Sequence, residues 1–190
     1  MKMFLSILTL LVALKSLSQT IEDKKGYIGI TLGPAFPLAD IKDKGDGGTG
    51  LNINLVNFGY PVWKNVGFCA SLFSGAHLSK TLREDALSVY GALLAGPMLS
   101  SNLSEKSILH MRAMVGSVYS MFEYAHNSGR SASESWTYGY SVGLMYRYNY
   151  SKTWCLLFNA DYFSAKSSAY DHLGEIAAIN VNAGIGLRLK

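Results

Sequence analysis

Residues 177–190 read AAINVNAGIGLRLK, and from Ala177 onward every second side chain in this stretch is apolar. The apolar positions are Ala177, Ile179, Val181, Ala183, Ile185, Leu187 and Leu189. Polar or small residues stand between them at Asn180, Asn182, Gly184, Gly186, Arg188 and Lys190. Successive side chains of a strand point to opposite faces, so this period of two predicts a β-strand with one apolar and one polar face.

A second stretch, residues 136–150 (WTYGYSVGLMYRYNY), alternates in the same way. Its apolar positions are aromatic at both ends, whereas Val142 and Leu144 in the middle are aliphatic. Lipid-facing strands carry aromatic side chains at the two membrane interfaces and aliphatic ones between them. The stretch therefore predicts a membrane strand with lipid on one face and a polar lumen on the other.

Six further segments complete a set of eight candidate strands. They are residues 28–32, 51–55, 66–72, 88–100, 108–119 and 154–162. The alternation is less regular in 88–100 and 108–119, where apolar residues occupy both faces. It changes phase at Leu55 and Val56, which indicates a β-bulge or the end of membrane contact.

Short and long connections alternate between these segments. The short ones are residues 61–65, 101–105 and 149–152, and the long, polar ones are 39–49, 77–85, 125–135 and 166–174. Bacterial barrels have short periplasmic turns and longer external loops, and closure satisfies backbone groups that an open sheet edge would leave unpaired in lipid. We therefore expect an all-β protein, a closed eight-stranded antiparallel up-and-down transmembrane β-barrel, with strands of about nine to eleven residues.

The first 18 residues have the features of a signal peptide. Lys2 is followed by an apolar run over residues 4–14, and Ser16 and Ser18 are small residues ahead of a cleavage site before Gln19. Residues 19–190 then form one barrel domain with 15 basic and 13 acidic side chains, a net charge of +2. Such a small excess of positive charge predicts no nucleic-acid binding.

The predicted barrel resembles the OmpA-like and OmpX-like transmembrane domains and the outer-membrane barrel domains common in Bacteroidetes. Asn182, Gly184, Leu187 and Leu189 match the terminal strand signal that the barrel-assembly machinery reads in such families, and residues 91–97 resemble their Gly-Pro strand. The chain differs from many relatives in lacking a final aromatic residue. The resemblance implies a monomer of the cell outer membrane, in contact with outer-membrane lipid and lipopolysaccharide, without a cofactor.

Polar residues at inward positions form a candidate lumen cluster. The cluster comprises Arg112, Arg147, Asp161, Asn180, Asn182 and Arg188, together with Asn159. Side chains nearly fill the interior of an eight-stranded barrel. We therefore interpret the cluster as a plug of hydrogen bonds and ion pairs, with a narrow gated pore as the alternative.

Catalysis has one weak candidate. His126 and Ser128, with Glu123 and Glu134 nearby, resemble the His-x-Ser pair of lipid A deacylases, which are also small outer-membrane barrels. A histidine can activate a serine, but the sequence fixes no third catalytic group. We predict no catalytic site.

Cysteines and acidic residues suggest no further site. Cys69 and Cys155 lie on the third and seventh predicted strands, on opposite walls, which are too far apart for a disulfide, so we expect two free thiols. Asp40, Asp43 and Asp46 lie in a glycine-rich loop, but their spacing does not match a calcium loop. We predict no metal site.

Four functional hypotheses remain. The first is a structural or interaction protein that acts through its external loops, and the second is a narrow pore. The third is an enzyme that modifies lipid A. The fourth is a soluble lipocalin-type barrel, which would place apolar residues inside and polar residues outside.

Overall fold

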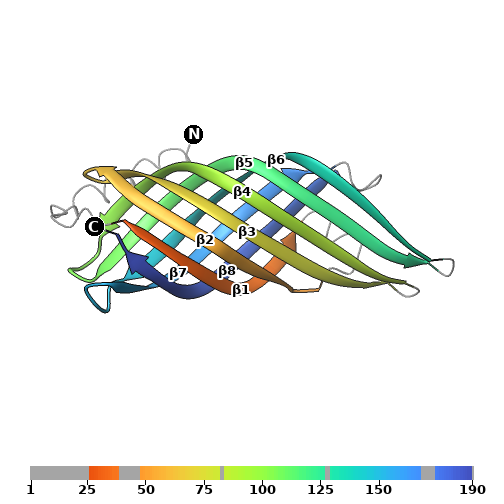
Figure 1. Ribbon diagram of the computed structural model, residues 1–190, viewed down its shortest axis with the longest axis horizontal. Coiled ribbons are helices and arrows are strands. Elements are labelled where there is room, and N and C mark those ends of the chain that lie inside the picture. The colour runs from red at the N-terminus through yellow and green to blue at the C-terminus, as the bar shows by residue number, and fades with distance from the viewer. Residues whose placement is uncertain (1–25, 39–47, 82–83, 127–128, 168–173, 190) are drawn as a thin grey trace, which may run out of the picture.

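The computed structural model describes residues 26–38, 48–81, 84–126, 129–167 and 174–189, with side chains except for residues 79–81, 84–86, 124–126 and 129–131. Its elements are all β-strands (Figure 1). They are β1 (Tyr27–Leu38), β2 (Gly50–Trp63), β3 (Val66–Thr81), β4 (Glu84–Asn102), β5 (Ser107–His126), β6 (Gly129–Tyr148), β7 (Trp154–Lys166) and β8 (Glu175–Arg188). Each predicted segment overlaps one of these strands, and the segments 136–150 and 177–190 run two residues past the ends of β6 and β8. No helix in the described residues is long and apolar enough to cross a membrane.

The eight strands form a closed barrel. Each is antiparallel to the next, and β8 pairs with β1 from Tyr27↔Arg188 to Leu38↔Ala177. Closure gives every strand two hydrogen-bonded neighbours, although over residues 129–138 the described part of β6 pairs with β5 alone. The predicted fold class is confirmed.

The strands are strongly tilted because their register shifts around the barrel. A path of paired residues that starts at Ile28 and crosses all eight strands returns to β1 at Leu38, ten residues further along. With about 3.3 Å per residue and about 4.8 Å between strands, this shift corresponds to a tilt of about 40° and a backbone radius of about 8 Å. Such an interior is just wide enough to be filled by side chains.

The two ends of the barrel differ. At one end, which we call the turn end, lie residue 26, the end of β8, and the short connections 64–65, 103–106 and 149–153 (Figure 1, left). At the other, which we call the hairpin end, the hairpins β3–β4 and β5–β6 extend beyond the remaining strands (Figure 1, right). The rim of the hairpin end is therefore uneven.

These extensions correct two predicted loops. Residues 77–85 and 125–135 were predicted as long loops, but β3 pairs with β4 as far as Thr81↔Glu84, and β5 pairs with β6 as far as His126↔Gly129. The predicted strand length is also wrong, since the strands have 12 to 20 residues. Beyond the apolar wall both faces of a strand meet water, so the alternation weakens although the backbone pairing continues.

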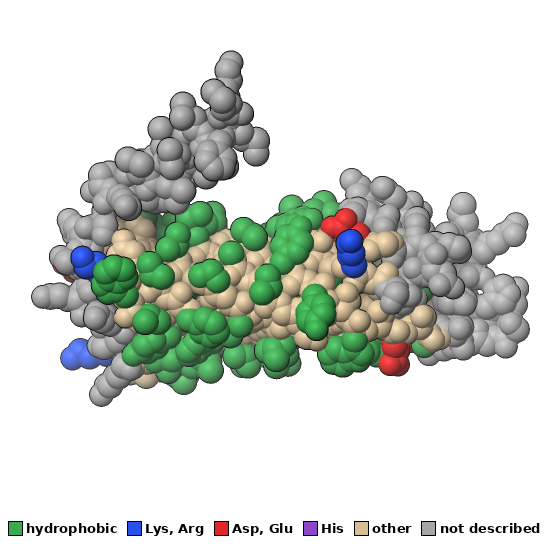
Figure 2. Space-filling model, turned by 90° about the horizontal axis from the view of Figure 1, so that it is seen from above, with side chains coloured by type: hydrophobic (Ala, Val, Ile, Leu, Met, Phe, Trp, Pro, Cys, Tyr) green, Lys and Arg blue, Asp and Glu red, His purple; other side chains and the backbone are tan. Residues whose placement is uncertain are grey.

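Outward-facing positions are apolar along the barrel. Large exposed side chains include Ile30 and Leu32 on β1, Leu144 on β6 and Ile185 on β8. Figure 2 shows hydrophobic side chains spread over the described wall, with charged side chains confined to its two ends on the face in view. The predicted outward face is confirmed, and the lipocalin-type hypothesis, which requires polar outward positions, is wrong.

The structure explains the irregular alternation on β2 and β4. The predicted bulge on β2 is confirmed, because the register with β3 shifts between Asn54 and Val56. On β4, buried Tyr90 and Leu94 alternate with the exposed Leu93. The lumen therefore receives large apolar side chains as well as the polar ones expected from the sequence.

Candidate functional site: the lumen of the barrel

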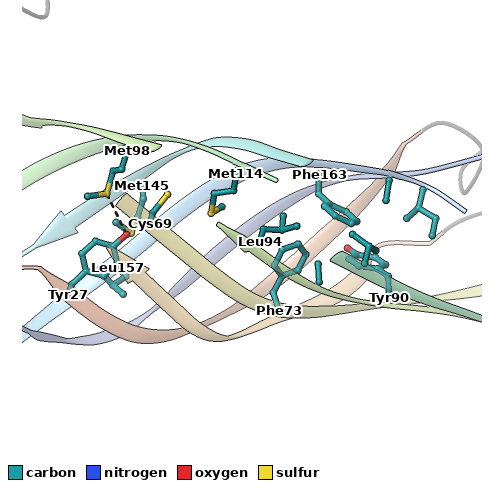
Figure 3. Close-up of a cluster of buried hydrophobic side chains, with 14 of the residues drawn as sticks. Tyr27, Cys69, Phe73, Tyr90, Leu94, Met98, Met114, Met145, Leu157 and Phe163 are labelled. Atoms are coloured by element: carbon teal, nitrogen blue, oxygen red, sulfur yellow. Dashed lines mark hydrogen bonds between the residues drawn. The ribbon is translucent and has the colours of Figure 1, made fainter. Parts of the chain in front are cut away.

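The lumen contains two apolar layers with a polar layer between them. Near the turn end, a sulfur-rich layer consists of Tyr27, Cys69, Met98, Met145 and Leu157, and near the hairpin end an aromatic layer consists of Phe73, Tyr90 and Phe163 with Leu94 (Figure 3). Only Met114 lies between these layers among the labelled residues of Figure 3. Polar side chains fill the space around it.

An ion pair forms the centre of the polar layer. Arg112 on β5 donates from Nη2 to both carboxylate oxygens of Asp161 on β7, at 2.9 and 2.8 Å. Arg112 also donates from Nη1 to Asn57 on β2 at 2.6 Å, and the Asn159 amide donates to Asp161 at 2.6 Å. Arg112 is 2% exposed and Asp161 7%, so this network ties three strands together in a nearly dry interior.

A glycine makes room for the carboxylate. Gly143 on β6 pairs with Asp161, and a Cβ atom at Gly143 would overlap the carboxylate of Asp161 and the backbone carbonyl of Ala160. Any other residue at this position would displace the ion pair. The glycine is thus part of the charge network although it carries no polar side chain.

Asparagines surround the ion pair on the side of the hairpin end. The Asn182 amide donates to Asn52 at 2.8 Å, and the Tyr90 hydroxyl donates to Asn180 at 3.3 Å. A cavity of about 10 Å³ lies among these groups, bounded by Asn52, Asn54, Ser71, Phe73, Met114, Ser141, Asp161, Asn180 and Asn182. This volume holds about one water molecule.

The six residues predicted as a lumen cluster do not lie together. Arg112 and Asp161 form the ion pair, while Asn180 and Asn182 belong to the asparagine group beside it. Arg147 lies nearer the turn end, with its guanidinium carbon 5.6 Å from the ring centroid of Tyr27.

The sixth residue, Arg188, is at the rim of the turn end, where it donates to the backbone carbonyl of Ser151 at 2.8 Å. Asn57 was not expected as a partner of Arg112, because β2 changes phase at its bulge. With the phase corrected there, Asn57 would have been found at an inward position.

The aromatic layer was also missed from the sequence. The ring of Phe163 lies edge-on to Phe73 with centroids 5.2 Å apart and is stacked on Tyr90 at 5.0 Å. His77 also stacks on Tyr90, with ring centroids 5.8 Å apart. These rings close the lumen above the asparagines.

The remaining predicted sites are placed as follows. Cys69 and Cys155 are free and buried, which confirms the predicted thiols. The side chain of His126 lies outside the described residues, as do Ser128 and the residues Asp40, Asp43 and Asp46. Among the side chains that the structure describes, no three His, Cys, Asp or Glu residues are grouped closely enough to hold a metal ion.

The proposed assembly signal lies on the strand that closes the barrel. Asn182 and Gly184 face the lumen side of β8, whereas Leu187 is exposed on the outer wall. Leu189 follows β8, and its N–H donates to the carbonyl of Gly26 at 2.8 Å. Recognition of these residues during assembly stays a prediction.

Comparisons with known proteins identify the fold. No family model matches the chain, and no curated protein sequence matches it. Among solved structures, Ail, the attachment invasion locus protein of Yersinia pestis, superimposes with a TM-score of 0.53 at 16% identity, covering 87% of this chain and 97% of Ail.

Two other structures agree. Neisserial surface protein A matches with a TM-score of 0.51 at 12% identity, covering 85% of this chain and 96% of the other. A major outer membrane protein from Thermus thermophilus matches with a TM-score of 0.54 at 12% identity, covering 87% and 99%. The chain has the fold of the small outer-membrane β-barrels. The predicted likeness to OmpA-like and OmpX-like barrels is confirmed at the level of fold.

Proposed function

We propose that this chain is an integral barrel of the bacterial outer membrane, with a closed lumen, that presents the hairpins β3–β4 and β5–β6 to the outside as an interaction surface. The observation that carries the proposal is the apolar outer wall bounded by aromatic side chains. On β6, Tyr148 lies at the turn end of this wall, and Trp136 and Tyr138, which are 74% and 85% exposed, lie towards the hairpin end.

The height of this wall fits a membrane. Tyr148 and Trp136 are twelve residues apart on the same face of β6. At about 3.3 Å per residue and a tilt of about 40°, this separation corresponds to about 30 Å along the barrel axis. The apolar band of outer-membrane barrels is about 25 Å tall, and interface aromatics flank it on both sides.

The hairpins extend beyond that band. From Trp136, β6 continues seven residues to Gly129, which adds about 18 Å at the same tilt. Residues 129–135 read GRSASES, a small and polar composition suited to water. Short turns mark the periplasmic end of such barrels, so the hairpins face the exterior of the cell.

The packed lumen supports a structural role over a pore. Two apolar layers and an ion-pair network fill the interior, and the cavity among the asparagines has a volume of about 10 Å³. Purified protein in planar lipid bilayers should therefore give no stepwise conductance. Regular conductance steps from the heat-modifiable, folded protein would contradict a closed lumen.

Membrane location is tested by fractionation. The full-length chain expressed in a Gram-negative host should be recovered in the outer membrane and should migrate differently on a gel with and without boiling. A soluble product, or one whose mobility is unaffected by boiling, would contradict a closed membrane barrel.

The interaction role is tested by shortening the hairpins in register. Phe122 pairs with Ser133, so replacement of residues 123–132 by Asn-Gly keeps the pairing below the cut, and replacement of residues 80–85 by Asn-Gly does the same below Ser79↔Ala86. We expect the shortened proteins to remain heat-modifiable in the outer membrane, while adhesion of the cells to one another and to immobilised polysaccharide or protein falls. Unchanged adhesion with both hairpins shortened would contradict the proposed role.

The proposal also covers the oligomeric state of the barrel and its insertion into the membrane. Closure of β8 on β1 leaves no strand edge at that seam for a second copy, which supports a monomer. Residues 182–189 contain the pattern that the barrel-assembly machinery reads in similar barrels, which supports insertion by that machinery. The role requires no cofactor and no catalytic residue.

A further inference from the structure

Each short connection at the turn end carries one exposed lysine. Lys64 is in the β2–β3 turn, Lys106 in the β4–β5 turn and Lys152 in the β6–β7 turn. Arg188 adds a fourth cation at this rim, and Glu105 is the one carboxylate among the residues described there. On the face shown in Figure 2, cationic side chains lie at this end (left), whereas both acidic and cationic side chains lie toward the hairpin end.

Hydrogen bonds fix the turns that hold these lysines. Backbone N–H groups of neighbouring strands donate to turn carbonyls, from Ser100 to Asn65, from Asn149 to Lys106 and from Arg188 to Thr153, at 2.7 Å each. The hydroxyl of Ser104 accepts from the N–H of Ser107 at 3.1 Å, and that of Ser151 accepts from the N–H of Trp154 at 2.8 Å. The strand pairing thus continues into the turns, and the lysines extend from a rigid rim.

Lys64 occupies a backbone conformation that does not favour lysine. Its φ is 41°, in the left-handed region, and it is the one described residue other than glycine with a positive φ. Asparagine or glycine is better suited to this region. A lysine at this position is therefore not explained by the turn itself, which indicates a role for its charge.

Aromatic side chains adjoin Lys64 and Lys152 on the outer wall. Trp63 directly precedes Lys64, whose Nζ lies 6.0 Å from the centroid of that ring, and exposed Tyr150 and Trp154 flank Lys152. Tryptophan and tyrosine rings lie at the headgroup level of a membrane. A lysine next to such a ring on the side away from the hydrocarbon lies at the level of the lipid phosphates.

We propose that Lys64, Lys106 and Lys152 form a binding surface for the phosphate groups of anionic phospholipids in the leaflet at the turn end. This inference rests on the proposed function, because it requires the barrel to span a bilayer with this rim at the lipid surface. The occupant is a lipid headgroup, since the cations encircle the rim next to interface aromatics and do not converge on one pocket. Three lysines, each contributing a roughly five-fold gain at an anionic surface, favour the inserted state by about a hundred-fold.

The test compares vesicles of two compositions. Purified full-length protein is folded into vesicles of phosphatidylcholine alone and into vesicles in which three lipids in ten are phosphatidylglycerol, and unfolding by urea is followed in both. The folding equilibrium constant should be about a hundred-fold larger in the anionic vesicles, from the same three lysines. High salt should remove most of the difference, because it screens exposed charges.

Variants separate lipid binding from turn stability. The triple variant K64Q/K106Q/K152Q should lose most of the difference between the two vesicles and keep only what Arg188 contributes, whereas K166Q, which neutralises an exposed lysine on β7 at the hairpin end, should retain the wild-type difference. K64N relieves the left-handed strain and should be more stable than wild type in phosphatidylcholine, yet gain less from phosphatidylglycerol.

Two outcomes overturn the inference. Either the wild-type protein is equally stable to urea in both kinds of vesicle, or the triple variant keeps the full wild-type difference between them. Neither outcome would affect the proposed function, which stands if the protein is heat-modifiable in phosphatidylcholine vesicles. Failure to fold into either vesicle would instead contradict the proposed membrane barrel.

Discussion

Replacement of Asp161 by asparagine removes one charge from the lumen at almost constant shape. In the native barrel the carboxylate accepts two hydrogen bonds from Nη2 of Arg112 and one from Asn159. In the variant, Arg112 keeps its bond to Asn57 but remains as a buried charge without its counter-ion. The new side-chain amide also directs its N–H groups toward the guanidinium of Arg112, which can only donate hydrogen bonds.

The expected loss in the free energy of unfolding is large because Arg112 and Asp161 are both buried. Removal of one member of a buried ion pair typically destabilises a protein by about 3–5 kcal/mol, mostly through the uncompensated charge. Arg112→Met should cost a similar amount, because it leaves the Asp161 carboxylate alone. The double variant R112M/D161N contains neither charge, so its cost should fall short of the sum of the single costs by about 3 kcal/mol or more.

Unfolding by urea in lipid vesicles measures these free energies. Tryptophan fluorescence is a suitable signal, since Trp63, Trp136 and Trp154 are all exposed on the outer wall and lose their lipid contact on unfolding. Glu105→Gln makes the same chemical change at an exposed turn residue and should cost less than about 1 kcal/mol. A similarly small cost for D161N, or additive costs in the double variant, would refute the view that this pair is the electrostatic centre of the barrel.

Three further variants test other parts of the structure. Gly143→Ala should destabilise the barrel by about 1–3 kcal/mol in the same urea assay, because the methyl group displaces the Asp161 carboxylate. Leu187→Asn should reduce the amount of folded protein in cells, whereas Ile185→Asn, another exposed position on β8, should not. The two β8 variants should fold equally well in vesicles. An equal loss of folded protein in cells for both variants would contradict an assembly signal at Leu187. Tyr90→Ala should cost about 3–5 kcal/mol but should remain non-conducting in planar bilayers, because the sulfur-rich layer still closes the turn end.

The outer wall was predictable because lipid imposes a simple rule on each strand. On β6 and β8 every outward position between the interfaces must be apolar, so the period of two is visible without knowledge of any neighbour. The rule ends where the lipid ends. Residues 129–135 pair with β5 as regularly as the β6 residues that follow them, but their composition is typical of a loop, and the extended hairpins were missed.

The lumen was less predictable because its contacts depend on the register of the whole barrel. Arg112 and Asp161 could be assigned to inward positions, but they are 49 residues apart and meet only because the strands are sheared by ten residues. Tyr90 and Leu94 lie on a strand with apolar residues on both faces, so the sequence did not determine which set pointed inward. The inward position of Asn57 could not be predicted from the alternation, because the β-bulge before it changes the phase of the strand.

The seam between β8 and β1 has a consequence for protein engineering. The N–H of Leu189 donates to the carbonyl of Gly26, so the residues that precede β1 and follow β8 are already within hydrogen-bond distance. A short peptide linker could join these residues, and new chain termini could be opened at the tip of the β3–β4 hairpin. The resulting circular permutant would keep the same neighbours around the barrel wall and the same lumen. In such a permutant β3 becomes the last strand in the chain, and residues 182–189 become internal. Barrel geometry and the identity of the terminal strand are therefore separable properties of this molecule.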